Sequence, residues 1–496
     1  MKADQENSSE LSCDYLVIGG GVSGMTMSLL LARSGADVIL LERSDHIGGS
    51  MQRFYRNGVP FDTGFHFTTT MDSAFGDMFR YLGMADHIRT KTVRKQLYLA
   101  AEDRMYDIPQ GHKNLIGYYS SIFPDYREQI IRFYETEENI YRDTPMFATY
   151  DREHMLCAEL KYRKEEHIVL QDYINSLHIP ANLATLLCSF AVCCCGTPAE
   201  ELSLASHARI SYGLDDHLVR FIGGGDAFIH EFKRLAADLK IRTFTGDSIR
   251  EFHPSKDTRR TESHTAETRN GKKISFQNCI FTIHPQSILT AIGPLLKNDL
   301  LRQRMEEFEE SCGFFSIWGK LADDVTITDD ILVSYLRKTE LPTLMSPKDP
   351  ENTATGVLLV NETDLRGNPC RTVTVFEQVF PEETDEWKET VSGKRGESYA
   401  VYKQRKQKSL EEKIYKVKPE LKGKVNFVAS ASQLTYRDYL SPFGSGYGIR
   451  QKIEQSNLFG RLPVRNFYVI GQNSLLPGAF GAMQSAFILW QKLVKS

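Results

Sequence analysis

A glycine-rich segment near the start of the chain, Gly19-Gly20-Gly21-Val22-Ser23-Gly24, constrains the fold most strongly. It follows a short apolar run at residues 14–18 and precedes a segment of helical character at residues 22–33. A second apolar run at residues 37–41 ends at Glu42. A buried strand, a glycine turn, a helix and a second strand in this order predict a βαβ unit that binds a dinucleotide.

Each part of this unit has its own physical task. Gly19 allows the tight turn, Gly21 lets the backbone approach a pyrophosphate, and Gly24 lets helix and strand pack closely. The helix begins at Val22-Ser23, where its positive dipole end favours an anion. Glu42 stands 18 residues after Gly24, a position from which a carboxylate accepts a hydrogen bond from a ribose hydroxyl.

Composition narrows the classes of function. At 496 residues, the chain is expected to form more than one domain. A net charge of −4 gives no reason to expect a nucleic-acid partner. No window approaches 18 uninterrupted apolar residues, and residues 1–12 are too polar for a signal peptide, so we predict a cytoplasmic location.

The nine cysteines predict no metal site. They are scattered along the chain, apart from Cys193-Cys194-Cys195. Three adjacent cysteines point in different directions on a helix or a strand and lack the spacing of zinc ligands. Scattered cysteines in a chain predicted to have no signal peptide are typical of a reducing compartment.

The rest of the chain alternates helical and strand-like segments. An Asn57-Gly58 turn predicts a hairpin over residues 54–62, and residues 74–239 have mainly helical character. Residues 255–271 are expected to form an exposed loop. Further strands are predicted at residues 241–245, 248–252, 274–283 and 466–470, with a second sheet formed by 314–321, 331–336, 355–360 and 371–379. Helices are predicted at residues 398–415 and 478–494.

The end of the chain has the same order of elements as its start: a strand, a glycine turn and a helix. The apolar run at 466–470 is followed by Gly471-Gln472-Asn473 and then by the helix at 478–494. A second glycine turn between strand and helix indicates that both ends of the chain meet at one ligand. The alternative is one more βα unit without a ligand.

Three blocks together resemble one family of flavoproteins. They are the N-terminal unit with Gly48-Gly49, the segment Asp62-Thr63-Gly64-Phe65-His66, and the segment from Gly471 to Ala482. The combination resembles the FAD-dependent phytoene desaturase superfamily, and within it the branch of carotenoid isomerases and all-trans-retinol 13,14-reductases.

This resemblance implies an α/β fold with two parts. A Rossmann-like FAD-binding domain of the amine-oxidase-like, two-dinucleotide-binding-domain type would comprise residues 1–110, 213–300 and 420–496. An inserted α+β substrate-binding domain would comprise residues 111–212 and 301–419.

The resemblance also implies which residues hold FAD. Gly19, Gly21 and Gly24 would hold the pyrophosphate, and Glu42 the adenosine ribose. Ser50 stands where many relatives have an arginine. Arg43 or Arg53 either compensates for the absent charge or is an ordinary surface arginine. The full set of implied FAD-binding residues is Gly19, Gly21, Val22, Ser23, Gly24, Glu42, Arg43, Gly48, Gly49, Ser50, Asp62, Thr63, Gly64, Ile249, Gly471, Gln472, Gly478, Ala479, Phe480, Gly481 and Ala482. For Ile249, a plain core position is the alternative to an adenine contact.

Two residues are candidates for catalysis. His66 lies beside the predicted flavin, either as a proton donor or with a structural hydrogen bond, and Tyr447 lies either on the substrate side or in the core. The helix that begins at Gly478–Ala482 would place backbone N–H groups at the flavin edge where negative charge accumulates. The sequence contains no evident triad, metal cluster or carboxylate pair, which fits a reaction carried by a flavin.

The implied activity is that of an FAD-dependent oxidoreductase. Its substrate would be a polyene, carotenoid or retinoid-like lipid, with desaturation, saturation and isomerisation left open, and NAD(P)H would bind only transiently. Apolar residues such as Leu115, Ile130 and Phe133 form either a helix core or a surface that contacts the inner face of a membrane. The alternatives are a flavin amine oxidase or protoporphyrinogen oxidase relative, and a non-enzymatic prenyl-lipid-binding protein.

Overall fold

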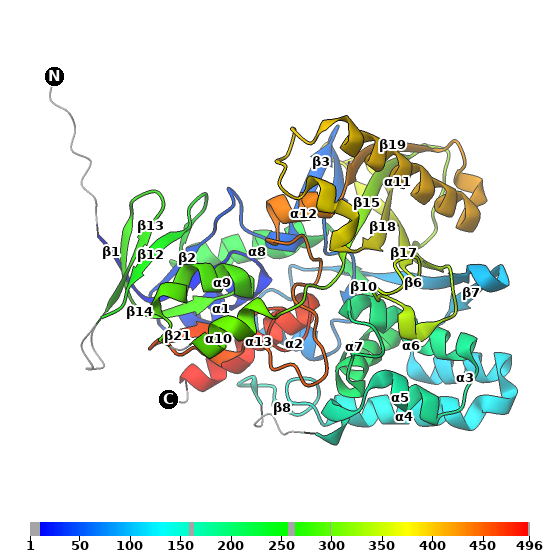
Figure 1. Cartoon of the computed structure of the whole chain (residues 1–496), viewed down its shortest axis with the longest axis horizontal. Helices are drawn as coiled ribbons and strands as arrows, with labels where there is room; N and C mark the ends of the chain where they lie inside the picture. The colour runs from blue at the N-terminus through cyan, green and yellow to red at the C-terminus, as the bar shows by residue number, and fades with distance from the viewer. Residues whose placement is uncertain (1–9, 158–162, 256–262, 298, 495–496) are drawn as a thin grey trace.

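A computed structural model describes residues 10–157, 163–255, 263–297 and 299–494. Figure 1 shows two lobes, each built around its own sheet, with a helical layer beneath the second lobe. The glycine-rich turn lies in the first lobe, on the side that faces the second.

The first sheet is the dinucleotide-binding one. Its strands are β1 (Leu11–Ile18), β2 (Val38–Leu41), β11 (Arg242–Phe244), β12 (Ile249–His253), β13 (His264–Thr268), β14 (Lys273–Phe281), β20 (Gly460–Arg461) and β21 (Phe467–Val469). They run in the order β11-β2-β1-β14-β13-β12, and β21 pairs with the second half of β14. The pairs β11-β2, β2-β1, β1-β14 and β14-β21 are parallel, so the carboxyl ends of these strands share one edge.

The second sheet is mostly antiparallel. Its strands are β5 (Thr68–Thr69), β6 (Thr90–Leu99), β7 (Arg104–Ile108), β10 (Leu218–Phe221), β15 (Gly313–Leu321), β16 (Asp330–Leu336), β17 (Ala354–Thr363), β18 (Pro369–Val379) and β19 (Val425–Ala431). The order is β19-β15-β18-β17-β16-β6-β10-β5, with β7 beside β6. Two small pairs join β3 (Arg53–Arg56) to β4 (Val59–Asp62) and β8 (Tyr150–Asp151) to β9 (Leu156–Cys157).

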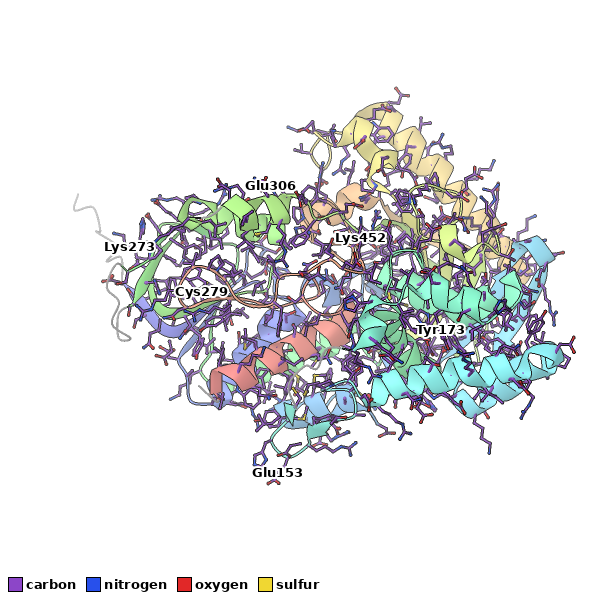
Figure 2. All side chains as sticks on the ribbon, turned by 60° about the horizontal axis from the view of Figure 1, so that its bottom comes forward. Glu153, Tyr173, Lys273, Cys279, Glu306 and Lys452 are labelled. Atoms are coloured by element: carbon purple, nitrogen blue, oxygen red, sulfur yellow. The ribbon has the colours of Figure 1, made fainter. Side chains whose placement is uncertain are left out.

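Helices cover both sheets and form the layer beneath the second one. They are α1 (Val22–Arg33), α2 (Ala74–Leu82), α3 (His112–Ile122), α4 (Arg127–Arg142), α5 (Leu170–Ser176), α6 (Ala181–Cys195), α7 (Leu204–Asp216), α8 (Gly225–Asp238), α9 (Pro285–Ile292), α10 (Asp299–Glu306), α11 (Gly396–Val417), α12 (Gln433–Tyr439) and α13 (Gly478–Val494). Figure 2 shows Cys279 of β14 inside the first lobe and Tyr173 of α5 inside the helical layer.

Helix α1 is buried on every side because α13 covers the face that the sheet does not. All residues from Ser23 to Leu31 are buried, and the α13 indole of Trp490 donates a hydrogen bond to Ser34 Oγ (2.9 Å) at the end of α1. An all-round apolar helix of this kind is stable only between two packed layers. The two helices whose N-termini were predicted to meet a ligand therefore lie side by side (Figure 1).

The predicted fold class is confirmed, and most predicted strands are present. The Asn57-Gly58 hairpin joins β3 to β4, with φ of 52° and 80° at the two turn residues. The prediction of mainly helix over residues 74–239 is wrong where β6, β7 and β10 occur. In β6 a charged residue occupies an inward-facing position, so the alternation of apolar and polar residues is hidden. This residue is Lys95, which is buried through its ion pair with Asp215 (2.7 Å). The loop predicted at 255–271 contains β13, and residues 256–262 lie outside the described part.

The second sheet crosses the predicted domain boundaries, whereas all strands of the first sheet fall in the ranges predicted for the FAD-binding domain. Strands β5, β6, β7, β10 and β19 fall in ranges predicted for the FAD-binding domain, yet they pair within the second sheet. The division into domains stays a prediction.

The apolar face of α3 and α4 packs into the helical layer. Leu115, Ile130 and Phe133 are fully buried there, and they do not line the cavity described below. In the described ranges, no helix combines the length and apolarity needed to cross a bilayer.

Candidate cofactor and substrate site

A cavity of about 630 Å³ lies between the two lobes. It begins at the β1–α1 glycine turn, passes the N-terminus of α13, and reaches the cavity-facing side of α7. Its volume is in the range of cofactor and ligand sites. Of the residues predicted to hold FAD, those that line it are Gly19, Gly21, Val22, Ser23, Glu42, Arg43, Gly48, Gly49, Ser50, Gly64, Ile249, Gln472, Gly478, Ala479, Phe480, Gly481 and Ala482.

The glycine turn leaves room for a ligand at one position only. A Cβ atom on Gly19, whose φ is 109°, would lie 2.5 Å from Thr282 Oγ1, and one on Gly24 would lie 1.9 Å from the Gly19 carbonyl oxygen. A Cβ on Gly21 would meet no atom within 4 Å. Gly19 and Gly24 therefore permit the turn and the packing, whereas Gly21 opens the turn toward the cavity.

Glu42 braces the turn as well as lining the cavity. Its Oε2 accepts the Gly20 N–H (2.6 Å) and its Oε1 accepts the Ser44 N–H (2.7 Å). Each carboxylate oxygen has a second lone pair for a ligand hydroxyl. Binding of a ribose by Glu42 stays a prediction.

The loop after Glu42 rests directly on the glycine turn. Gly48 donates its N–H to the Gly20 carbonyl oxygen (2.7 Å), and a Cβ on Gly49 would lie 3.3 Å from Gly21 Cα. Of the two arginines considered as substitutes for the charge absent at Ser50, Arg43 lines the cavity. Arg53 does not, because its guanidinium is buried against Asp62 (2.9 Å) and Glu362 (2.7 Å).

Helix α13 directs its first turn at the cavity. Gly478, Ala479, Phe480 and Gly481 line it, so that the unpaired N–H groups of a helix N-terminus face the space between the lobes. Gly471 lies behind this turn, where its N–H donates to Ser485 Oγ (3.0 Å). The structure thus brings Gln472 to the cavity but not Gly471.

The segment from Asp62 to His66 divides into two parts. Asp62 and Thr63 turn away from the cavity, toward Arg53 and toward the Gln52 carbonyl oxygen (2.7 Å from Thr63 Oγ1). Gly64 and His66 line it. Neither Asp62 nor Thr63 thus reaches the cavity with its side chain.

The His66 imidazole is neutral and incompletely satisfied. Its ring stacks on Phe376 with 4.8 Å between centroids, and its buried Nδ1 has no hydrogen-bond partner among the described residues. Burial and, to a smaller extent, the nearby Arg220 guanidinium together lower the pKa of His66 to about 4. An orphaned polar atom at a cavity wall fits a ligand that supplies its partner.

A buried network of ion pairs supports the part of the cavity wall that contains His66. The Arg220 guanidinium contacts Glu362 and Asp330 (3.3 Å to Oδ2), and Arg53 bridges Asp62 and Glu362. Lys91 adds a contact to Asp330 (2.8 Å). Because the network joins β3, β4, β6, β10, β16 and β17, it ties the segment before His66 to the second sheet.

The other catalytic candidate, Tyr447, lies beside β15 of the second sheet. It lines the cavity and packs against Phe314 (5.8 Å between centroids), and burial raises its pKa well above the ordinary value for a phenol. Tyr447 therefore remains protonated at neutral pH. A substrate contact by Tyr447 stays a prediction.

The sequence is similar to a family of dinucleotide-binding domains and to several enzymes. Residues 17–82 match the family described as an NAD(P)-binding Rossmann-like domain. The chain is 20% identical to an all-trans-retinol 13,14-reductase of Macaca fascicularis, over 97% of this chain and 85% of the relative. A 4,4'-diaponeurosporene oxygenase of Staphylococcus haemolyticus is 28% identical over 26% of each chain.

The predicted resemblance is confirmed. The chain also has the fold of solved oxidoreductases. One from Methanosarcina mazei has a TM-score of 0.65 at 12% identity, covering 97% of this chain and 99% of its own. Putrescine oxidase bound to putrescine has a TM-score of 0.62 at 12% identity, covering 98% and 100%. The prediction of an oxidoreductase with a dinucleotide-binding domain is likewise confirmed.

Several residues that were not predicted also line the cavity. At the end near Ile249 they include Ser248, Arg250 and Arg269. The positions of these residues in the sequence do not by themselves indicate a common site. Near His66 and Tyr447 they include Phe314, Phe376, Tyr436, Cys194 and Arg209. Isolated aromatic residues in strands and helices look like ordinary core positions, so only the tertiary structure identifies them.

Proposed function

We propose that this chain holds FAD in the cavity between its lobes and transfers electrons to or from carbon–carbon double bonds of a polyene lipid. FAD would supply the two-electron redox chemistry, with NAD(P)H as a transient partner. The observation that carries the proposal is one continuous cavity with two unlike ends. The glycine turn and the N-terminus of α1 form one end, the N-terminus of α13 lies along the cavity, and aromatic and aliphatic side chains form the other end.

The residues of the chain fit the cofactor. Val22 and Ser23 at the start of α1 offer N–H groups to a pyrophosphate, with open space above Gly21. The first turn of α13 offers N–H groups where negative charge develops on an isoalloxazine edge. Gly64 and His66 form a wall beside that region, where neutral His66 is able to hydrogen-bond but not to carry charge.

The far end of the cavity suits an apolar polyene. Phe67, Ile210, Leu214, Leu476 and Phe480 line it. Such a wall orients an apolar chain and excludes water, which alignment for hydride transfer requires. The phenol of Tyr447 is the candidate proton donor on this side.

The test is spectroscopic. Purified protein that is incubated with FAD and then separated from unbound FAD should show flavin absorbance at ~450 nm. After anaerobic photoreduction, mixing with retinol or a carotenoid should reoxidise the flavin, with a product of altered conjugation. Protein that stays colourless favours the lipid-binding alternative, and a flavoprotein indifferent to all polyenes contradicts the proposed substrate class.

The protonation state of His66 gives a second expectation. Because its pKa is lowered from 6.5 to about 4, the imidazole stays neutral from about pH 5.5 upward. The rate of flavin reoxidation should therefore show no step between pH 5.5 and 7.5 that disappears in His66→Gln. A step near pH 6.5 that this substitution abolishes would contradict a buried neutral histidine.

An amine oxidase remains the second candidate because of the likeness to putrescine oxidase in fold. Phe314, Phe376, Tyr436 and Tyr447 do supply aromatic rings. Amine oxidases usually hold a water molecule near the flavin with a lysine, and among the described residues the cavity lining contains no lysine. Turnover of putrescine with release of hydrogen peroxide would decide for this alternative.

We also propose peripheral contact with a membrane. Tyr439, with 63% of its surface exposed, lines the cavity together with Leu440 and Pro442, and Phe443 beside them is 45% exposed. Aromatic residues at a cavity mouth suit a bilayer interface from which a lipid enters. Replacing Tyr439 and Phe443 by serine should reduce sedimentation with liposomes, whereas Leu365→Ser, 70% exposed elsewhere, should not.

A further inference from the structure

One face of α7 forms the end wall of the cavity. Arg209, Ile210, Gly213 and Leu214 line it, and this spacing places them on one side of the helix. The remaining arginines in the lining, Arg43, Arg250 and Arg269, belong to the loop after β2 and to the β12–β13 region of the first sheet. Arg209 is therefore the cation that serves the apolar end.

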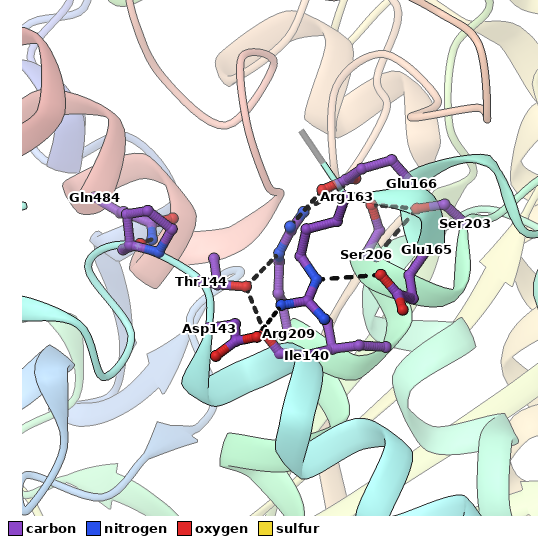
Figure 3. Close-up of polar contacts among 11 residues, drawn as sticks. Ile140, Asp143, Thr144, Arg163, Glu165, Glu166, Ser203, Ser206, Arg209 and Gln484 are labelled. Atoms are coloured by element: carbon purple, nitrogen blue, oxygen red, sulfur yellow. Dashed lines mark hydrogen bonds and ion pairs between the residues drawn. The ribbon is translucent and has the colours of Figure 1, made fainter. Parts of the chain in front are cut away.

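The Arg209 guanidinium is held in place and partly neutralised. Its Nε–H donates to Thr144 Oγ1 (3.1 Å), and its two Nη atoms contact the two carboxylate oxygens of Glu166 (3.2 Å for Nη1 to Oε2) (Figure 3). Arginine has five N–H donors. Among the described residues, three of them have acceptors and two have none, and Arg209 is one of the residues that line the cavity.

The neighbouring Arg163 provides a contrast within the same cluster. It contacts Asp143 (2.6 Å) and Glu165 (3.2 Å), and it does not line the cavity. Figure 3 shows the two arginines adjacent to each other. Replacing Arg163 removes a positive charge from this cluster without changing the cavity lining, whereas replacing Arg209 changes both. Comparing the two substitutions therefore separates the effect of charge from the effect of cavity contact.

We propose that Arg209 is the specificity residue for the polar end of the substrate, and that this end is an uncharged oxygen, an alcohol or a carbonyl. The proposal rests on the proposed polyene function. The free N–H groups of Arg209 donate to such an oxygen while Glu166 keeps its bidentate contact. A substrate carboxylate would face Glu166 at close range and would have to displace it, at the expense of a like-charge contact. A hydrocarbon end would leave the donors without an acceptor.

The experiment measures binding rather than turnover. Retinol fluorescence titration gives Kd for retinol, and displacement gives Kd for retinoic acid and for the matching hydrocarbon without oxygen. Wild-type protein is expected to bind retinol about 5- to 10-fold more tightly than either competitor. Arg209→Gln should remove this preference by weakening retinol alone, and Arg209→Lys should restore part of it. Arg163→Gln, the matched control, should leave all three constants unchanged.

Glu166→Gln gives an independent reading. It removes the competing carboxylate and keeps the shape, so retinoic acid should gain at least about tenfold in affinity while the hydrocarbon does not change. Equal affinities for the three ligands in wild type, or a preference unaffected by Arg209→Gln, would overturn the inference and leave the polyene function standing. Failure of wild type to bind any of the three would instead overturn the polyene function and the inference with it.

Discussion

Replacing Gly21 by valine is expected to give a folded protein that no longer retains flavin. The backbone of Gly21, with φ of −75° and ψ of −176°, is extended and open to any residue. A Cβ there meets no protein atom within 4 Å, so the new side chain enters only the space assigned to the pyrophosphate. The lost N-cap preference costs about 1 kcal/mol at most. Flavin absorbance after gel filtration, together with the far-UV circular dichroism spectrum, measures both parts of the prediction.

The matched control for this substitution is Gly117→Ala. Gly117 lies exposed within α3, where an added Cβ also meets nothing within 4 Å, but it is remote from the cavity. Alanine in a helix interior favours the helix by about 1 kcal/mol over glycine. Gly117→Ala should therefore keep bound flavin. Retention of flavin by Gly21→Val would mean that no cofactor phosphate lies above that turn.

Replacing Arg220 by methionine is expected to destabilise the protein by about 3–5 kcal/mol. The side chain is 3% exposed and contacts Glu362 and Asp330, so its removal leaves buried carboxylates with fewer cationic partners. The same change releases the wall that contains His66. Urea denaturation followed by circular dichroism measures the loss, and flavin fluorescence reports any loosening of the site.

Arg94→Met tests whether burial, rather than charge alone, sets this effect. Arg94 pairs with Asp107 (2.9 Å) on the same sheet, but both side chains are about half exposed. Exposed pairs contribute at most about 1 kcal/mol because water and salt screen them. Similar losses for Arg220→Met and Arg94→Met would show that the buried network does not stabilise the second sheet.

The dinucleotide-binding half of the fold was predictable because its signals are local. The turn at Gly19–Gly24 requires glycine for steric reasons, and the strands on either side are short apolar runs. The β6 strand was missed because Lys95 and the other polar residues conceal its alternation, and only the distant partner Asp215 explains the burial of that lysine.

For the site, sequence reasoning found the residues that lie in motifs and missed those that converge from separate elements. Arg209, Phe376 and Tyr436 belong to a helix, a strand of the second sheet and another helix, and no spacing connects them. Asp62 and Thr63 show the converse. They belong to a motif, but their side chains support the wall instead of facing the cavity.

The position of β14 between β1 and β21 has a consequence for biosynthesis. The glycine turn leaves the ribosome early, but β1 has no neighbour on one side until residues 273–281 are made, and α1 stays uncovered until α13 follows. In a nascent chain, the side of α1 that packs on α13 therefore stays uncovered until the C-terminal helix has been made. If FAD binds where the two helix N-termini meet, as we propose, its site is complete only after α13 has been synthesised.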